Sequence, residues 1–398
     1  MLLYVRMQFQ KNMNSRVVGI DASNIRGGGG LTHLMELLCA TQSELHGIER
    51  VVVWGGKITL NGLQERAWLI KHNPPALNQG LLKRTIWQRF CLSSAARMEG
   101  CDVLFVPGGS YAGNFQPVVT MSQNLLPFEI SELWRYGWSF FTLKLLLLRL
   151  MQSHTFKKAE GVIFLTEYAH EVVMKVTGKL CGKTSIVPHG LNPRFNRTPK
   201  VQHNIAEYND NHPYRVLYVS IIDEYKHQWH VVDAIAILRK KGLPIELDLV
   251  GPANPRALKR LNTTIDCVDA KRHWVNYRGA IAFDELHHQY AQADLGLFAS
   301  SCENMPNILL EIMAAGLPIA CSKKGPMPEI LGHAGIYFDP EQPEDIARAL
   351  LVLIESPQLR NELSKTSYAS TKKYSWKRCA DETFGFLSEV AQEYKGSN

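Results

Sequence analysis

Residues 300–318 read Ser300-Ser301-Cys302-Glu303-Asn304-Met305-Pro306-Asn307-Ile308-Leu309-Leu310-Glu311-Ile312-Met313-Ala314-Ala315-Gly316-Leu317-Pro318. Proline suits the first turn of a helix, so a helix is predicted to begin near Pro306, continue through the apolar run 308–315 and stop at the following glycine. Glu303 then lies in the loop before the helix, and Glu311 projects from about its second turn.

The helix start between these two carboxylates suggests a binding site. Unpaired N–H groups and the positive end of the helix dipole bind phosphate groups without a metal. We therefore expect a diphosphate there, with one carboxylate facing a sugar and the other facing a ribose. The alternative is an ordinary amphipathic helix that carries two solvated glutamates.

Short apolar runs alternate with helical stretches along the chain, which predicts α/β structure with parallel, doubly wound sheets. In the first half the predicted strands are Arg16–Asp21, Val51–Trp54, Val103–Val106, Val118–Met121 and Gly161–Leu165. In the second half they are Arg215–Val219, Glu246–Gly251, Asn276–Arg278, Leu295–Phe298 and Ile319–Cys321. The polar, aperiodic stretch Leu191–Pro213 indicates a linker. We expect Rossmann-like domains over 15–195 and 213–376, with a C-terminal helix over 377–398 that packs back on the first.

Composition agrees with this organisation. A chain of 398 residues accommodates two domains, and a hydrophobic fraction of 45% with 20% charged residues is typical of a globular protein. The eight cysteines are scattered, which favours reduced thiols in the cytoplasm. Met1–Asn14 has no apolar h-region, so we predict no signal peptide and a fold that begins near Arg16. The net charge of +7 favours an anionic partner, but no nucleic-acid motif accompanies it.

The carboxylate pair and its neighbours resemble a known family. Glu303 and Glu311 match the E-x7-E motif of the family-four retaining glycosyltransferases, also called glycosyl transferases group 1. The resemblance runs from Gly27 to about Trp376 and includes, in the expected order, Val275–Gly279, Tyr290–Leu295, Pro328–Ile330 and Ala334–Phe338. It implies the GT-B fold, in which two Rossmann-like domains face a cleft.

The resemblance also implies which residues bind a nucleotide-sugar donor. Lys226 falls where the family's phosphate-binding lysine lies, although Ile221 stands where the family usually has arginine. Gly28-Gly29-x-x-x-His33 resembles the family's N-terminal phosphate-facing loop. The expected donor-binding residues are therefore Gly28, Gly29, Lys226, Arg278, Asn304, Met305, Pro306, Asn307, Ile308 and Glu311, and the expected catalytic ones are Glu303 and Lys226.

Acceptor and metal sites are less distinct in the sequence. Gln123 and Asn124 follow a predicted strand where family members often carry a histidine; amides bond sugar hydroxyls but are no base. His189 lies in a turn similar to the family's P-N-G-V-D, and a mere interdomain turn is the alternative. Glu246-x-Asp248 lies inside a predicted strand, so we expect no metal and no other cofactor.

The segment Trp134–Lys158 contains five basic residues and no acidic one, interleaved with aromatic and leucine side chains. It is too short and too charged to span a bilayer. A basic, aromatic helix can lie against an anionic membrane surface. A core helix with a solvated basic edge is the equal alternative.

Taken together, the sequence predicts a metal-independent, cytoplasmic and peripheral hexosyltransferase. It would move a hexose with retention from a GDP- or UDP-sugar to a surface polysaccharide or lipid-linked glycan. Two alternatives stay open at this point: a nucleotide-sugar epimerase of the same fold, and a catalytically silent subunit that binds the nucleotide-sugar in a glycan-assembly complex.

Overall fold

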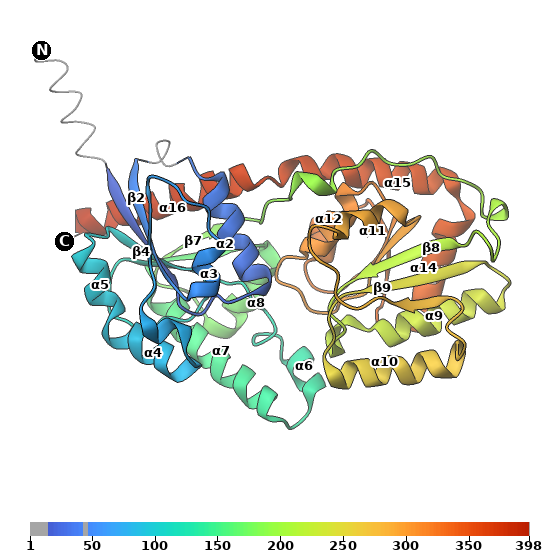
Figure 1. The fold of residues 1–398 in the computed structure, drawn as a ribbon, viewed down its shortest axis with the longest axis horizontal. Coiled ribbons are helices and arrows are strands. Elements are labelled where there is room, and N and C mark those ends of the chain that lie inside the picture. Colours follow the sequence, from blue (N-terminus) through green and yellow to red (C-terminus); the bar gives the residue numbers. More distant parts are fainter. Residues whose placement is uncertain (1–14, 43–46, 398) are drawn as a thin grey trace, which may run out of the picture. The chain divides into compact units, whose positions relative to one another are not determined.

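The computed structural model describes residues 15–42 and 47–397. The prediction for Met1–Asn14 falls outside this range. The chain forms two compact α/β units (Figure 1). Unit 1 comprises the chain up to Phe128, Leu143–Gly190 and the chain from Tyr374 onward, and unit 2 comprises Glu129–Thr142 and Leu191–Lys373.

Unit 1 is built on a parallel sheet with the strand order β3-β2-β1-β4-β5-β6-β7. Val18 of the central strand aligns with Val51 on one side and Val103 on the other, and all three are fully buried. The strands are β1 (Arg16–Ala22), β2 (Ile48–Gly55), β3 (Leu69–His72), β4 (Val103–Val106), β5 (Val118–Met121), β6 (Gly161–Phe164) and β7 (Lys183–Ile186).

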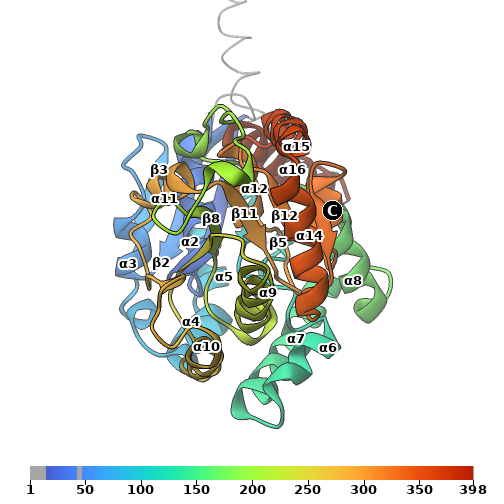
Figure 2. The ribbon, with the colours of Figure 1, turned by 90° about the vertical axis from the view of Figure 1, so that its right-hand side faces the viewer.

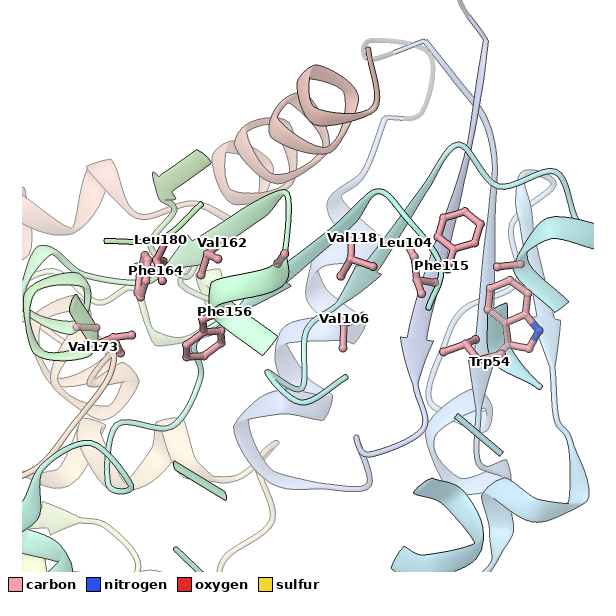
Figure 3. Close-up of a cluster of buried hydrophobic side chains, with 14 of the residues drawn as sticks. Trp54, Leu104, Val106, Phe115, Val118, Phe156, Val162, Phe164, Val173 and Leu180 are labelled. Atoms are coloured by element: carbon pink, nitrogen blue, oxygen red, sulfur yellow. The ribbon is translucent and has the colours of Figure 1, made fainter. Parts of the chain in front are cut away.

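Helices cover both faces of this sheet and bury its apolar side chains. Figure 3 shows part of the core, in which Phe156 and Phe164 lie near Val162 and Leu180. The helices are α2 (Gly28–Ala40), α3 (Lys57–Asn61), α4 (Leu81–Phe90), α5 (Leu92–Met98), α7 (Phe140–Lys158), α8 (Glu167–Thr177) and α16 (Trp376–Ser397), with the 3-10 turn η2 (Pro75–Asn78). The C-terminal α16 packs on α2, β4 and β6.

Unit 2 is built on a second parallel sheet with the order β10-β9-β8-β11-β12-β13. Its strands are β8 (Tyr214–Val219), β9 (Ile245–Val250), β10 (Val275–Tyr277), β11 (Leu295–Phe298), β12 (Ile319–Ser322) and β13 (Ile336–Phe338). In each sheet the strand order proceeds outward in both directions from the first strand, β1 or β8, which is a doubly wound order. The predicted parallel, doubly wound organisation is therefore confirmed.

The helices of unit 2 follow its strands in sequence (Figure 2). They are α9 (Gln228–Lys240), α10 (Pro255–Val268), α11 (Leu286–Gln292), α12 (Asn307–Ala314), α13 (Met327–Leu331), α14 (Pro343–Glu355) and α15 (Pro357–Ser370). Segment 129–142 adds α6 (Ile130–Leu133) and η3 (Trp134–Tyr136) to this unit. The remaining 3-10 turns are η4 (Pro193–Phe195), η5 (Ile205–Glu207), η6 (Glu224–Lys226) and η7 (Thr371–Lys373).

The units differ from the expected ranges at two places. Segment 129–142, which falls inside the expected first domain, contacts unit 2, and the predicted linker Leu191–Pro213 packs along unit 2 as well. Phe195 is buried against Tyr290, and the Arg197 N–H donates to the Ala314 carbonyl at 2.9 Å. Polar composition indicated a linker, and in the structure this stretch belongs to unit 2.

Candidate functional site

The helix predicted around the carboxylate pair is present as α12. Pro306 caps it, Ala315 ends it, and Gly316 follows with φ +66°. Glycine is required there, because a Cβ would meet backbone atoms of Arg197 and Pro199 at 2.8 Å. The preceding loop leaves the C-terminal end of β11, which is where parallel α/β sheets bind ligands. The local fold therefore places Glu303 just before the helix start.

Glu303 and Lys226 form a direct ion pair in unit 2. Lys226 ends the short η6 turn after β8, and its side chain is 7% exposed against 16% for Glu303. Its ammonium group also lies over the rings of Tyr225 and Phe298, at 4.8 and 5.4 Å from their centroids. A buried lysine needs such compensation, because an unpaired charge would be costly to desolvate. The two residues predicted to be catalytic therefore contact each other.

Glu311 lies on α12 with its side chain buried inside unit 2. Its carboxyl group accepts a hydrogen bond of 2.8 Å from the Tyr290 hydroxyl. Burial raises the pKa of Glu311 to about 8, against the lowering effects of the Tyr290 bond and of Arg194. Burial therefore favours the protonated form of this carboxyl group, and its predicted contact with a ribose stays a prediction.

The other expected donor residues fall into three places. Asn304, Met305 and Pro306 are buried beside Glu303, while the next two residues in α12 are partly exposed. Arg278 follows β10, where Asp248 binds its guanidinium at 2.8 and 2.7 Å. Among the contacts described, none joins Arg278 to Lys226 or Glu303.

The glycine run differs from the loop that was expected. Helix α2 already begins at Gly28, which has φ +62°, so Gly28 and Gly29 form its first turn. Both are exposed, and a Cβ built on either would meet nothing within 4 Å. The expectation that these glycines form a strand-to-helix loop was therefore wrong, because they belong to the helix itself. Without side chains they leave open space beside the helix start. Their contact with phosphate remains a prediction.

The predicted acceptor residues Gln123 and His189 both contact His33 of α2 within unit 1. The Gln123 amide lies 3.3 Å from His33 Nδ1, and the His33 and His189 rings lie 4.7 Å apart. His189 also stacks on Trp376 of α16 at 5.7 Å. Burial, followed by the neighbouring His189, holds the pKa of His33 well below its usual range. Asn124 points elsewhere: its side chain accepts from the Leu126 N–H at 3.1 Å.

A buried polar network was not anticipated from the sequence. Ser301 donates to Glu132 at 2.6 Å, and His227 Nε2 lies 2.9 Å from the same hydroxyl. Glu132 in turn binds Arg135, which also binds Glu341. Glu132 and Ser301 are 169 positions apart, so no local pattern links them. The one local signal was the spacing of Glu132 and Arg135, which suits an ion pair within a helical turn.

The strand pair Glu246 and Asp248 has other partners than a metal. Asn276 donates to both carboxylates, at 2.8 and 3.2 Å, and Asp248 also holds Arg278. Within the described residues, no group of three or more metal-binding side chains comes together. No helix in the described part of the chain combines the length and apolar character that a membrane span requires.

Comparison with known proteins identifies the region that holds the Lys226–Glu303 pair. Residues 213–356 match the family of glycosyl transferases group 1. This segment is a glycosyl transferases group 1 domain. O-antigen chain mannosyltransferase B from Escherichia coli is 29% identical over 110 residues, which cover 28% of this chain and 29% of that protein. The first three curated relatives match over only 21% to 44% of their own length.

Solved glycosyltransferases show that the fold is GT-B. Sucrose-phosphate synthase from Thermosynechococcus elongatus superposes with a TM-score of 0.73 over 96% of this chain and 100% of that chain, at 16% identity. HepE from Anabaena, solved in complex with UDP, gives a TM-score of 0.67 over 94% and 100% of the two chains, also at 16% identity. These superpositions confirm the fold that the sequence indicated, and the match over residues 213–356 confirms the resemblance to the family.

Proposed function

We propose that the chain is a retaining, metal-independent glycosyltransferase that moves a hexose from a nucleotide-sugar to a glycan or lipid-linked acceptor. The observation that carries the proposal is the Lys226–Glu303 pair at the C-terminal ends of β8 and β11, inside a glycosyl transferases group 1 domain. It places a buried cation and a carboxylate beside the start of α12, which is itself an anion site.

Each member of this group has a distinct proposed role. Lys226 and the N–H groups around Asn307 neutralise the diphosphate, which gains negative charge as it departs. Glu303 faces the sugar and stabilises an oxocarbenium-like transition state. Glu311, once ionised, accepts hydrogen bonds from the ribose. Gly28 and Gly29 of unit 1 would approach the diphosphate through their backbone N–H groups.

Two nucleotide classes fit the proposed donor. HepE from Anabaena was solved with UDP, and the relative from Escherichia coli is named as a mannosyltransferase. A UDP-hexose and GDP-mannose are therefore the donors to test. Base recognition through backbone groups leaves no side-chain pattern that would separate them.

The acceptor is proposed to bind near Gln123 and His189 in unit 1. Gln123 has no basic atom, and His33 is fully buried with Nδ1 directed at the Gln123 amide. A separate base is then not required if the leaving phosphate takes the proton of the acceptor hydroxyl on the same face. Such a front-face reaction retains the anomeric configuration.

We also propose that unit 1 attaches to an anionic membrane surface, on the inner face of the membrane. The segment Trp134–Lys158 is not one helix as expected, because η3 and α7 are separate elements. Arg135 forms ion pairs with two glutamates, Glu132 and Glu341. Helix α7 buries one face in the core. Its other face exposes Lys144 and several large apolar side chains: Leu143, Leu147, Leu150 and Met151.

Helix α4 extends this surface in a way that the sequence did not suggest. Its Leu82, Ile86 and Phe90 are 74%, 49% and 74% exposed. Residues 81–98 and 138–158 contain no acidic side chain. Both helices hold the loop 108–113, through Gln88 and Thr155 respectively, and both views place them at the same end of unit 1 (Figures 1 and 2). Exposed apolar groups flanked by cations suit an anionic bilayer surface.

A thermal-shift panel tests donor binding directly. UDP-glucose or GDP-mannose should raise the unfolding temperature of the wild type, because a ligand that binds only the native state stabilises it. Lys226→Ala should abolish the shift. Tm values without ligand show whether each variant is folded. A shift that survives in folded Lys226→Ala would remove Lys226 from the diphosphate site.

Vesicle sedimentation tests the membrane surface. Lys83→Glu with Lys144→Glu should reduce binding to phosphatidylglycerol vesicles at low salt, since each basic residue near such a surface contributes on the order of 1 kcal/mol. The matched control is Lys259→Glu with Lys271→Glu, two exposed lysines of unit 2 with the same change of charge. Equal loss in both pairs would indicate a general charge effect and contradict the proposed surface.

A further inference from the structure

Segment 129–142 is fastened to unit 2 by a chain of buried polar contacts, which we call the Glu132 clasp. Its members are Glu132, Arg135, His227, Ser301 and Glu341. Ser301 lies at the centre, 2.6 Å from Glu132 and 2.9 Å from His227 Nε2. Glu132 binds Arg135 at 2.6 and 3.0 Å, and Arg135 binds Glu341 at 2.7 and 3.1 Å.

The clasp is buried at its centre. Glu132, Ser301 and His227 are 6%, 3% and 0% exposed. Ser301 has one proton, which it donates to Glu132, so its oxygen accepts from His227 Nε2. Burial, and then the neighbouring Arg135, lower the pKa of His227 to about 3. A neutral imidazole with its proton on Nε2 satisfies this arrangement.

The backbone at His227 adopts a conformation that L-residues rarely adopt. His227 has φ 55° and ψ 30°, in the left-handed region that favours glycine. Such backbone conformations persist where the surroundings hold them, and they cluster at functional sites. The residue with this backbone conformation, His227, is also the one whose side chain contacts Ser301.

The clasp includes residues from both segments of the chain that carry the Lys226–Glu303 ion pair. His227 follows Lys226 directly, and Ser301 lies two residues before Glu303. The Ser301 N–H also donates to the Tyr225 carbonyl at 2.9 Å, which ties the two backbone segments together. Beside them, the Tyr136 hydroxyl donates to Asp223 at 3.0 Å, so segment 129–142 also holds the start of η6.

We propose that the Glu132 clasp positions Lys226 and Glu303 for sugar transfer, with Ser301 and His227 as positioning residues that act through their neighbours in the chain. The inference rests on the proposed glycosyltransferase function. Its physical reason is that transfer requires the cation and the carboxylate at fixed places relative to the diphosphate and the sugar. A misplacement of about 1 Å can reduce a rate by up to 100-fold.

Ser301→Ala is the sharpest test, because it removes the central hydroxyl with little change in volume. It should lower kcat roughly tenfold or more, while KM for the nucleotide-sugar changes less than about threefold. Turnover is expressed per nucleotide-binding site, titrated with nucleoside diphosphate, so that unfolded protein does not count. Ser301→Thr keeps the hydroxyl and should recover most of kcat.

His227→Gly provides a second test with a matched control. Glycine relieves the backbone strain but removes the bond to Ser301, so kcat should fall even if the unfolding temperature does not. Arg272 is the other described residue outside glycine with positive φ, at 54°, and it pairs with Asp266 on the surface. Arg272→Gly should relieve similar strain and leave kcat unchanged.

The outcomes separate the two proposals. If kcat per binding site in Ser301→Ala equals that of the wild type while only the unfolding temperature falls, the clasp is purely structural and the inference is overturned. The inference also fails if Ser301→Thr is as slow as Ser301→Ala. A wild type that neither binds nucleoside diphosphate nor transfers sugar would overturn the glycosyltransferase function and this inference with it.

Discussion

At the scale of single residues, the ion pair between Lys226 and Glu303 changes what a substitution should do. Glu303→Gln removes the carboxylate that compensates a buried ammonium group. In this variant no carboxylate at position 303 competes with the diphosphate for the Lys226 ammonium group. We therefore expect nucleoside diphosphate to bind more tightly, by roughly threefold or more. Isothermal titration with UDP or GDP measures this. Weaker binding than in the wild type would show that Glu303 does not compete for Lys226.

Glu311 should give the protein a specific pH dependence. Because the folded pKa of about 8 lies above the ordinary value of 4.5, the folded state holds the proton more tightly than the unfolded chain. Stability should therefore fall as pH rises from about 4.5 to about 8, by a few kcal/mol in total. Glu311→Gln keeps an acceptor for Tyr290 and should remove this slope. Urea unfolding at pH 5.5 and 8.5 measures it, and equal slopes in both proteins would contradict the assignment.

Several of these residues could not be read from the sequence. The E-x7-E spacing indicated Glu303 and Glu311, because both flank one helix start. The partner of Glu311, Tyr290, and the partners of Ser301 come from distant segments that only the fold brings together. Ile221, which stands where the family usually has arginine, is 38% exposed.

At the scale of elements, the inner strands of both sheets and the edge strand β10 were predicted, whereas three other edge strands were missed. Val103–Val106 and Leu295–Phe298 are fully buried apolar runs and match the prediction. The missed strands β3, β7 and β13 each lie at an edge of a sheet and are partly exposed. Strands β3 and β7 contain polar residues, which is normal for an edge, where one side has no neighbour to pack against, and β13 is only three residues long. Polar residues interrupt the apolar pattern of the first two, and the third is too short to show a pattern.

The turn after α12 gives a prediction at the same scale. Gly316→Ala should destabilise the protein by about 1–3 kcal/mol, because the residue has positive φ and a Cβ would collide with the backbone of Arg197 and Pro199. Gly332 is the matched control: its φ is +58°, but a Cβ there meets nothing within 4 Å. Thermal unfolding of both alanine variants separates strain from collision. Equal losses would show that the collision contributes nothing.

At the scale of the whole molecule, two parallel sheets were predictable because short apolar strands alternate with helical stretches along both halves of the chain. Assignment of segment 129–142 to unit 2 was not, because it depends on Glu132 and Tyr136 reaching partners far along the chain. The exposed apolar face of α4 was also missed, since Leu82, Ile86 and Phe90 have the same spacing as core residues of a helix. Periodicity finds an apolar face but does not say whether protein covers it.

Acceptor-dependent release of nucleoside diphosphate tests the central claim most directly. The wild type is incubated with UDP-glucose or GDP-mannose, with and without a panel of free and lipid-linked oligosaccharides, and the product anomer is determined by NMR. We predict release that depends on acceptor, a product that retains the donor configuration, and turnover at least about tenfold slower in Glu303→Gln. Tight donor binding without release for any acceptor, or a product with inverted configuration, would contradict the account.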